Sequence, residues 1–133
     1  MILTGGTLGC TLNFIKAFVD TQTSSGLGGM IHCTGTGPAL LNLDGSKFMT
    51  ITSNLDGGLF YLSMTDTITL QGKANTVIDT TTSKTGSGGV AYLSSLADVF
   101  GEFVGTSSIS TSTANKNGGA FYLDGQGINT LNI

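Results

Sequence analysis

The sequence predicts an all-β protein, a parallel β-helix (β-solenoid) of about five coils, each with about 30 residues and three short strands. Gly-Gly pairs recur at residues 5–6, 28–29, 57–58, 88–89 and 118–119, so successive pairs lie 23, 29, 31 and 30 residues apart. The residues after each pair are similar, and three of the five units continue with Tyr-Leu. Threonines also precede the last four pairs at matching distances. A unit of this kind cannot bury its apolar face alone, so the units are expected to stack along one axis.

Composition limits the possible functions. The chain has 133 residues, which suits one domain over residues 1–133. Only 10% of residues are charged, with five Lys and no Arg, so no basic surface for nucleic acid is present. The 39% apolar content argues against disorder. No apolar run is long enough for a transmembrane helix.

Each unit contains three short strands rich in Thr, Ile, Val and Phe, which suit a pleated surface. The first strand follows the Gly-Gly pair, as at Gly58–Leu62. The second strands are expected at Leu40–Leu43, Thr67–Leu70, Val99–Val104 and Ile128–Ile133. The third strands carry the threonines, at Phe48–Thr52, Val77–Thr82 and Ile109–Thr113. Gly, Asn, Ser and Asp between the strands supply turns.

Side chains alternate along a strand, so the second and fourth residues after each Gly-Gly share a face. These residues are Leu8, Ile31, Phe60, Ala91 and Phe121, and Cys10, Cys33, Leu62, Leu93 and Leu123. All are apolar or cysteine, so this face is predicted to be the core. The residues between them then face outward, and they are Gly9, His32, Tyr61, Tyr92 and Tyr122. We expect Tyr61, Tyr92 and Tyr122 to form an outward ladder, either structural or a platform for glycans.

Cys10 and Cys33 fall in one column of neighbouring coils by this alignment. Their Cα atoms would then lie about 4.8 Å apart, which a disulfide accepts. They are either bonded or free core cysteines, and both alternatives stay open. The pair has no third or fourth ligand for zinc, so no metal site is expected.

A Thr-x-Thr/Ser pattern precedes each of the last four Gly-Gly pairs. Its members are Thr21, Thr23, Thr50, Thr52, Thr81, Ser83, Thr111 and Thr113. Val19, Phe48 and Ile109 lie two residues earlier and are apolar, so a straight strand would point the threonines inward as well. Inward stacking is the expectation. A turn within the strand would reverse it, and the alternatives are then a glycosylated surface or an ice-binding face.

No catalytic or cofactor site can be derived from the sequence. His32 is the only histidine, and no nucleophile or carboxylate is placed to orient it. Asp66, Asp98 and Asp124 fall at different offsets from Gly-Gly, so they form no column. We expect no enzyme activity and no cofactor.

The Gly-Gly-x-x-Tyr-Leu units at Gly57–Leu62, Gly88–Leu93 and Gly118–Leu123 resemble the Gly-Gly-Ala-Ile repeats of polymorphic outer-membrane protein passengers. They are equally similar to other large microbial surface β-helix proteins. The resemblance covers essentially the whole chain. It implies that the β-helix is right-handed and lies on a cell surface or in secreted material.

The ends of the predicted solenoid carry no capping segment, although a β-helix exposes backbone and core at both ends. We expect the ends to stack on a second copy, head to tail, or on a flanking β-helix of the same protein. The function expected is therefore that of an extracellular structural protein in a fibre or surface stalk. The alternative is a glycan-binding or adhesin module, or an ice-binding β-helix.

Overall fold

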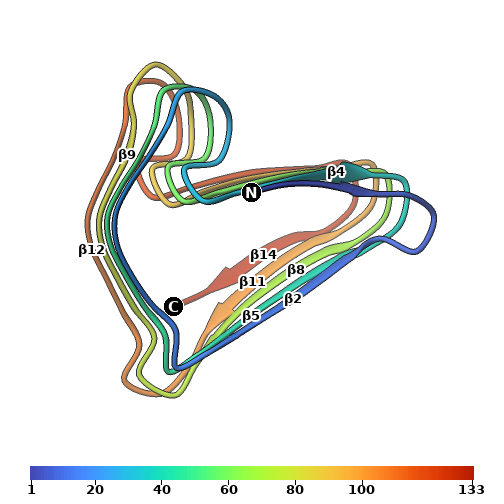
Figure 1. Ribbon diagram of the computed structural model, residues 1–133. Helices are drawn as coiled ribbons and strands as arrows, with labels where there is room; N and C mark the ends of the chain where they lie inside the picture. Colours follow the sequence, from blue (N-terminus) through green and yellow to red (C-terminus); the bar gives the residue numbers. More distant parts are fainter.

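The computed structural model describes residues 1–133 as a parallel β-helix of fourteen strands with no helix. In Figure 1 the chain turns clockwise as it recedes, so the β-helix is right-handed, as the resemblance implies. The structure therefore contains no helix that could cross a membrane.

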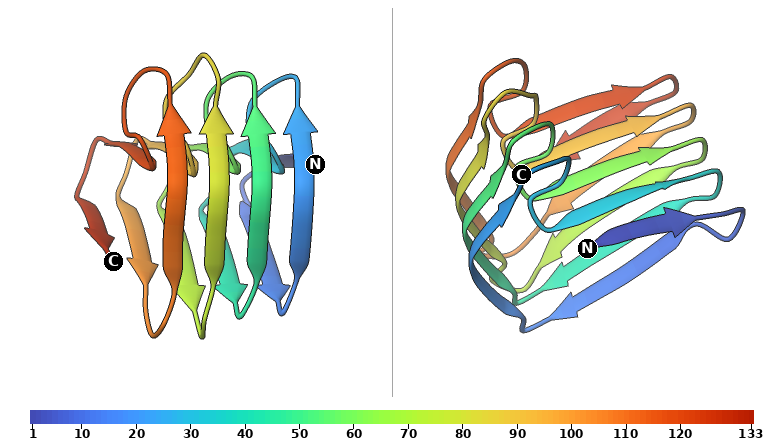
Figure 2. Two further views of the ribbon diagram at one scale, coloured as in Figure 1. Left: turned by 90° about the vertical axis from the view of Figure 1, so that its left-hand side faces the viewer. Right: turned by 45° about the horizontal axis from the view of Figure 1, so that its top comes forward.

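The β-helix has the shape of a three-sided prism, and one parallel sheet forms each side. Figure 2 shows the strands of these sheets stacked coil upon coil. Sheet A contains β1 (Ile2–Gly5), β4 (Ile31–Gly35), β7 (Phe60–Met64), β10 (Ala91–Ser95) and β13 (Phe121–Gly125). Sheet B contains β2 (Cys10–Ile15), β5 (Ala39–Asp44), β8 (Ile68–Lys73), β11 (Val99–Phe103) and β14 (Asn129–Asn132). Sheet C contains β3 (Phe18–Ser24), β6 (Lys47–Ser53), β9 (Val77–Ser83) and β12 (Ser108–Ala114). The chain thus makes four complete coils and a fifth that lacks a sheet C strand.

The core is built from alternate residues of each strand. In the middle coils these residues are fully buried, and in sheet A they include Ile31, Phe60, Leu62 and Leu93. Leu41 and Leu70 are fully buried in sheet B, and Phe48 and Ile78 are fully buried in sheet C. The inward face predicted for the segments after residue 28 is therefore confirmed.

The Gly-Gly pairs from residue 28 onwards form one corner of the prism, and the two glycines of a pair are required for different reasons. The first glycine of each pair has a positive φ between 60° and 68°, which glycine adopts without strain. The second glycine of the pairs at 28–29, 57–58 and 88–89 lies against the next coil, as where a Cβ atom on Gly58 would overlap the carbonyl oxygen of Gly89. Backbones can approach this closely only because no side chain is present.

The first Gly-Gly pair does not belong to this series, and the prediction that it does is wrong. Gly5 aligns with Gly35, and Ile2 aligns with His32. Leu8, expected in the core, lies in a turn and is 95% exposed. Gly9, expected in the tyrosine column, precedes β2 instead. The spacing of 23 residues to the next pair, shorter than the other three, was the signal of this difference.

Candidate functional site

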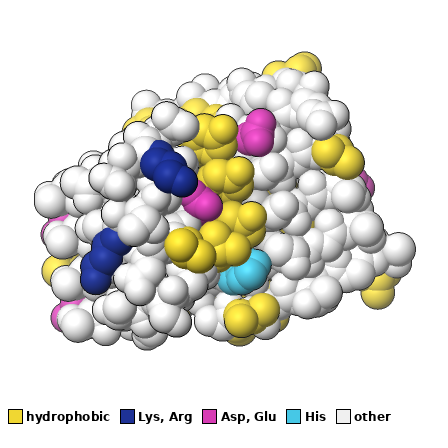
Figure 3. Space-filling model, turned by 90° about the horizontal axis from the view of Figure 1, so that it is seen from above, with side chains coloured by type: hydrophobic (Ala, Val, Ile, Leu, Met, Phe, Trp, Pro, Cys, Tyr) yellow, Lys and Arg dark blue, Asp and Glu magenta, His cyan; other side chains and the backbone are white.

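The three tyrosines form a stacked ladder on the outer face of sheet A, as predicted. Tyr61, Tyr92 and Tyr122 are Cα partners in β7, β10 and β13. The ring centroids are 5.0 Å apart for Tyr61 and Tyr92 and 4.9 Å apart for Tyr92 and Tyr122, with interplanar angles of 10° and 21°. His32 continues the column, and its ring is nearly perpendicular to that of Tyr61, with an interplanar angle of 86° and ring centroids 5.1 Å apart. Figure 3 shows a band of hydrophobic side chains with the histidine beside it.

The surroundings of His32, Tyr61 and Tyr92 shift the pKa of each group in the direction that favours its uncharged form. Burial is the main reason that the pKa of Tyr61 lies above its ordinary value, and the nearby charge of Asp56 adds to it. The pKa of Tyr92 is also raised, first by burial and then by Tyr61 and Asp124. Burial and the terminal amino group lower the pKa of His32.

The stacking decides which parts of the tyrosines a ligand can reach. Both faces of the Tyr92 ring lie against a neighbouring tyrosine, so only ring edges and the hydroxyl remain for solvent. A sugar binds an aromatic side chain through its face, and the ladder presents little free face. The geometry suits a structural ladder better than a platform for glycans.

Two columns of threonine cover the outer face of sheet C, and we call them together the threonine strip. The first column is Thr21, Thr50, Thr80 and Thr111, and the second is Thr23, Thr52, Thr82 and Thr113. All eight side chains are exposed or partly exposed. The expectation that the threonines stack inward is therefore wrong for Thr21, Thr23, Thr50, Thr52, Thr111 and Thr113.

The reason is the backbone of the first column. Its four threonines have φ between 49° and 56°, in the left-handed region that β-branched residues rarely adopt. The left-handed threonine interrupts the alternation of side chains along the strand. Ile78 points inward, Thr80 points outward although it lies two residues later, and the next residue points inward again. A straight strand would not allow this.

Thr81 does not belong to the strip, although its distance from Gly-Gly predicts that it does. Thr80 takes its place, and Thr81 is fully buried with its hydroxyl 2.9 Å from that of Ser112. Ser83 aligns with Ser53, so the loop from Ser83 to Gly89 is one residue longer than its counterpart from Ser53 to Gly58. Counting back from Gly88–Gly89 therefore misplaces the threonines of this unit by one residue.

The strip also forms hydrogen bonds between coils. The Thr113 hydroxyl donates to the Thr82 hydroxyl at 3.2 Å. Beside the strip, the Ser110 hydroxyl donates to the Asp79 carboxylate at 2.7 Å, which holds the pKa of Asp79 below its ordinary value. These contacts follow the coil repeat, so they bind one coil to the next.

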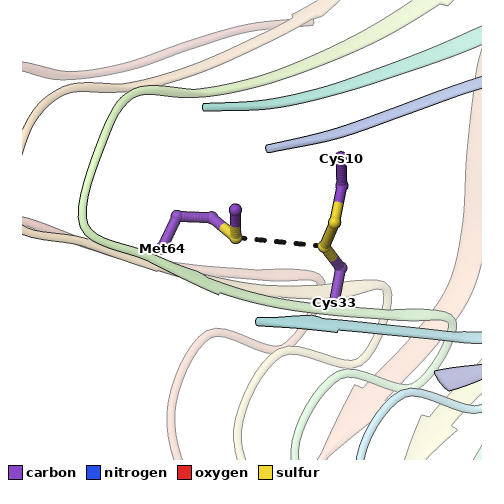
Figure 4. The surroundings of a disulfide bond; sticks show 3 residues. All are labelled: Cys10, Cys33 and Met64. Atoms are coloured by element: carbon purple, nitrogen blue, oxygen red, sulfur yellow. Dashed lines mark hydrogen bonds between the residues drawn. A yellow bond between two sulfur atoms is a disulfide. The ribbon is translucent and has the colours of Figure 1, made fainter. Parts of the chain in front are cut away.

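Cys10 and Cys33 form a disulfide, but not along one column. Cys10 pairs with Ala39 in sheet B, whereas Cys33 lies between Leu3 and Leu62 in sheet A. Their Cα atoms are 6.9 Å apart, and the bond crosses the core between the first two coils. Figure 4 shows Met64 directed at the same bond, with its sulfur 3.9 Å from that of Cys33. A disulfide sulfur carries no proton, so this is a packing contact between sulfur atoms.

The structure contains no cluster of metal-binding side chains. No group of three His, Cys, Asp or Glu side chains is placed to hold a metal ion. The largest hollow, of about 350 Å³, lies at the first coil between Met1, Ile2, His32 and residues 22–29, and no carboxylate lines it.

The two ends of the solenoid are open. Strands β1, β2 and β3 have a partner on one side only, as do β12, β13 and β14 at the other end. Inward residues that are fully buried in the middle coils are only partly buried here, including Leu12, Phe14 and Val19 in the first coil and Phe121 and Leu123 in the fifth. Met1, which aligns with the fully buried Ile31, is 61% exposed.

No family model, curated protein or solved structure matches this chain. The right-handed β-helix with its tyrosine ladder, threonine strip and open ends is therefore the basis of its functional assignment.

Proposed function

We propose that the protein is an extracellular structural β-solenoid, part of a fibre or surface stalk that extends by stacking coil upon coil. The observation that carries this proposal is the state of the two end coils. Their strand edges offer unpaired N–H and C=O groups, and their inward residues are incompletely covered. Unpaired edges of this kind are templates for further strands.

The composition supports close packing of added coils. Only 13 of 133 residues are charged, five positive and eight negative, so like-charge repulsion between stacked units is small. Each added coil would complete backbone hydrogen bonds and cover apolar side chains of the coil below it.

The disulfide supports an extracellular location. Disulfides persist in oxidising compartments and are rare in the cytosol. The Cys10–Cys33 bond is buried in the core of the first two coils, where it has a structural rather than a redox role.

The partner proposed is further β-helix, from a flanking segment or from a second copy. The fifth coil has strands only in sheets A and B. A second copy stacked directly on β13 and β14 would leave one strand position in sheet C empty.

Electron microscopy of negatively stained protein, together with light scattering in dilute buffer, tests this proposal. Fibres or end-to-end oligomers that grow with protein concentration are expected. A discrete, monodisperse monomer at all concentrations would overturn the proposal.

Ice binding by the threonine strip is a second candidate function. It is favoured because every residue in both columns is threonine, whereas the other outward columns vary from coil to coil. The strip repeats a hydroxyl and a methyl group at the strand spacing of about 4.8 Å. A lattice of this kind could order water over four coils.

The test is the growth of single ice crystals in solutions of the protein. We expect the protein to slow or shape the crystals, Thr52→Lys to abolish the effect, and Thr69→Lys to retain it. Thr69 is a matched control, because it is also partly buried but faces outward from sheet B. No effect of the unmodified protein, or equal effects of the two variants, would exclude this function.

A further inference from the structure

We propose that Tyr61, Tyr92 and Tyr122 are a site of oxidative cross-linking, at which a haem peroxidase and hydrogen peroxide join neighbouring rings into dityrosine. The product would bond coil three to coil four or coil four to coil five. This inference does not depend on whether the ends of the solenoid stack.

The first argument is the alignment of the rings. The three tyrosines are direct Cα partners on adjacent strands, with ring centroids 5.0 and 4.9 Å apart. The parallel sheet fixes this alignment. Two radicals formed on neighbouring rings would therefore meet without diffusion, at a high effective concentration.

The second argument is access. The rings stand on the outer face of sheet A and are partly exposed, with no further layer of the chain over them. A small oxidant or a radical mediator can reach their edges. The ring carbons next to each hydroxyl lie on those edges, and a ring can turn about its Cα–Cβ bond to bring two such carbons together.

The third argument is the lack of competing groups. The chain contains no tryptophan, and both cysteines are held in the disulfide. The three tyrosines are all the tyrosines of the chain. A one-electron oxidant thus finds the ladder as its main target among side chains that form stable radicals.

The reaction balances with one hydrogen peroxide for each bond. Each of two tyrosines loses one electron and its hydroxyl proton, which gives two phenoxyl radicals. The radicals couple through a carbon–carbon bond between the ring positions beside the oxygens. The hydrogen on each of these carbons then moves to the phenol oxygen and restores the aromatic ring. The two electrons and two protons removed reduce hydrogen peroxide to two water molecules.

The experiment treats the purified protein in dilute solution with a haem peroxidase and hydrogen peroxide. Dityrosine fluorescence, the loss of two hydrogen atoms in the intact mass, and mapping of cross-linked peptides are the measurements. We expect bonds between Tyr61 and Tyr92 and between Tyr92 and Tyr122 within one chain, with the product still at monomer mass on a denaturing gel.

Three variants separate the ladder from general oxidation. Tyr92→Phe leaves Tyr61 and Tyr122 two coils apart, so dityrosine within the chain should fall at least about tenfold. Tyr61→Phe and Tyr122→Phe each leave one adjacent pair. Because Tyr92 takes part in both pairs and each chain forms one bond, these variants should retain at least about half of the yield. Phenylalanine preserves the ring stack, and circular dichroism checks that each variant is folded.

Cross-links found only between chains, or a yield in Tyr92→Phe equal to that of the unmodified protein, would overturn the proposal. Absence of dityrosine in the folded protein, with formation after denaturation, would overturn it as well.

Discussion

A disulfide joins Cys10 of β2 to Cys33 of β4, so the bond ties sheet B of the first coil to sheet A of the second across the core. The first coil has a neighbour on one side only, and its inward residues are partly exposed. The disulfide therefore holds an end coil that backbone pairing secures on one side only.

Removing this bond should destabilise the protein. The two cysteines are 23 residues apart in sequence, and closing a loop of that length contributes about 3 kcal/mol to the free energy of unfolding. The double variant Cys10→Ala, Cys33→Ala should lose about this amount in urea denaturation. Hydrogen exchange should become faster first in β1 and β2. If the double variant has the same unfolding midpoint and the same exchange rates as the unmodified protein, the bond has no such role.

The close approach of coils at the Gly-Gly corner can be tested by two substitutions in one column. An alanine Cβ atom at Gly58 would overlap the carbonyl oxygen of Gly89, whereas one at Gly119 would meet no atom within 4 Å. Gly58→Ala should lower the free energy of unfolding by about 3 kcal/mol or more, and Gly119→Ala should leave it nearly unchanged. Thermal and denaturant unfolding measure both. Equal effects of the two would show that the contact with the next coil is unimportant.

The left-handed threonines should be strained. Thr50 has a φ of 54°, and such a conformation costs about 1 kcal/mol or more for a residue other than Gly, Asn or Asp. Thr50→Asn should therefore raise the free energy of unfolding by about 1 kcal/mol. Thr52→Asn is the control, because Thr52 has ordinary strand geometry and asparagine is a poorer strand residue. A loss of stability in Thr50→Asn similar to that in Thr52→Asn would refute the idea of strain.

The sequence was sufficient to predict the coil architecture because the repeat has a physical cause. Gly57 and its equivalents need a positive φ, and Gly58 and its equivalents need close approach, so both glycines recur once per coil. Tyr92 and its partners recur because identical residues stack at the strand spacing. These constraints act at fixed positions, which makes them visible as periodicity.

The periodicity alone could not predict the register of every unit or the direction of the threonine side chains. The extra residue between Ser83 and Gly89 lies in a loop, where insertions are tolerated, and it moved the expected column from Thr80 to Thr81. Nothing in the sequence indicates that Thr50 adopts a left-handed conformation, which is unfavourable for a β-branched residue. The alignment of Cys10 with Cys33 depends on the first Gly-Gly pair, which does not belong to the series. It therefore places both cysteines in one column and leaves open whether they are bonded, whereas they form a disulfide across the core.

The tyrosine ladder should make the protein less stable in alkali. The pKa values of Tyr61 and Tyr92 are raised above the ordinary value of 10.0 in the folded state, chiefly by burial. Above pH 10 the unfolded chain releases these protons first, so the folded state binds more protons and its stability falls as pH rises. Unfolding measured below and above pH 10, with Tyr61→Phe, Tyr92→Phe as the control, should show a smaller decrease in the variant. Phenolate absorbance that titrates as in free tyrosine would contradict this prediction.

The missing sheet C strand of the fifth coil predicts how assembly can be strengthened. Asn132 aligns with Glu102, so a copy of residues 104–120 placed after Ile133 would supply a strand like β12 and its Gly-Gly corner. That segment ends at the residue before Phe121, and Met1 of a second copy would then continue the column of Ile31, Phe60 and Phe121. Two extended chains would stack with no vacant strand position. Such a chain should form longer fibres than the original at equal concentration, because every strand edge at the junction is paired. A chain extended by a Gly/Ser segment of equal length is the control, and equal fibre lengths in the two would show that stacking does not proceed coil upon coil.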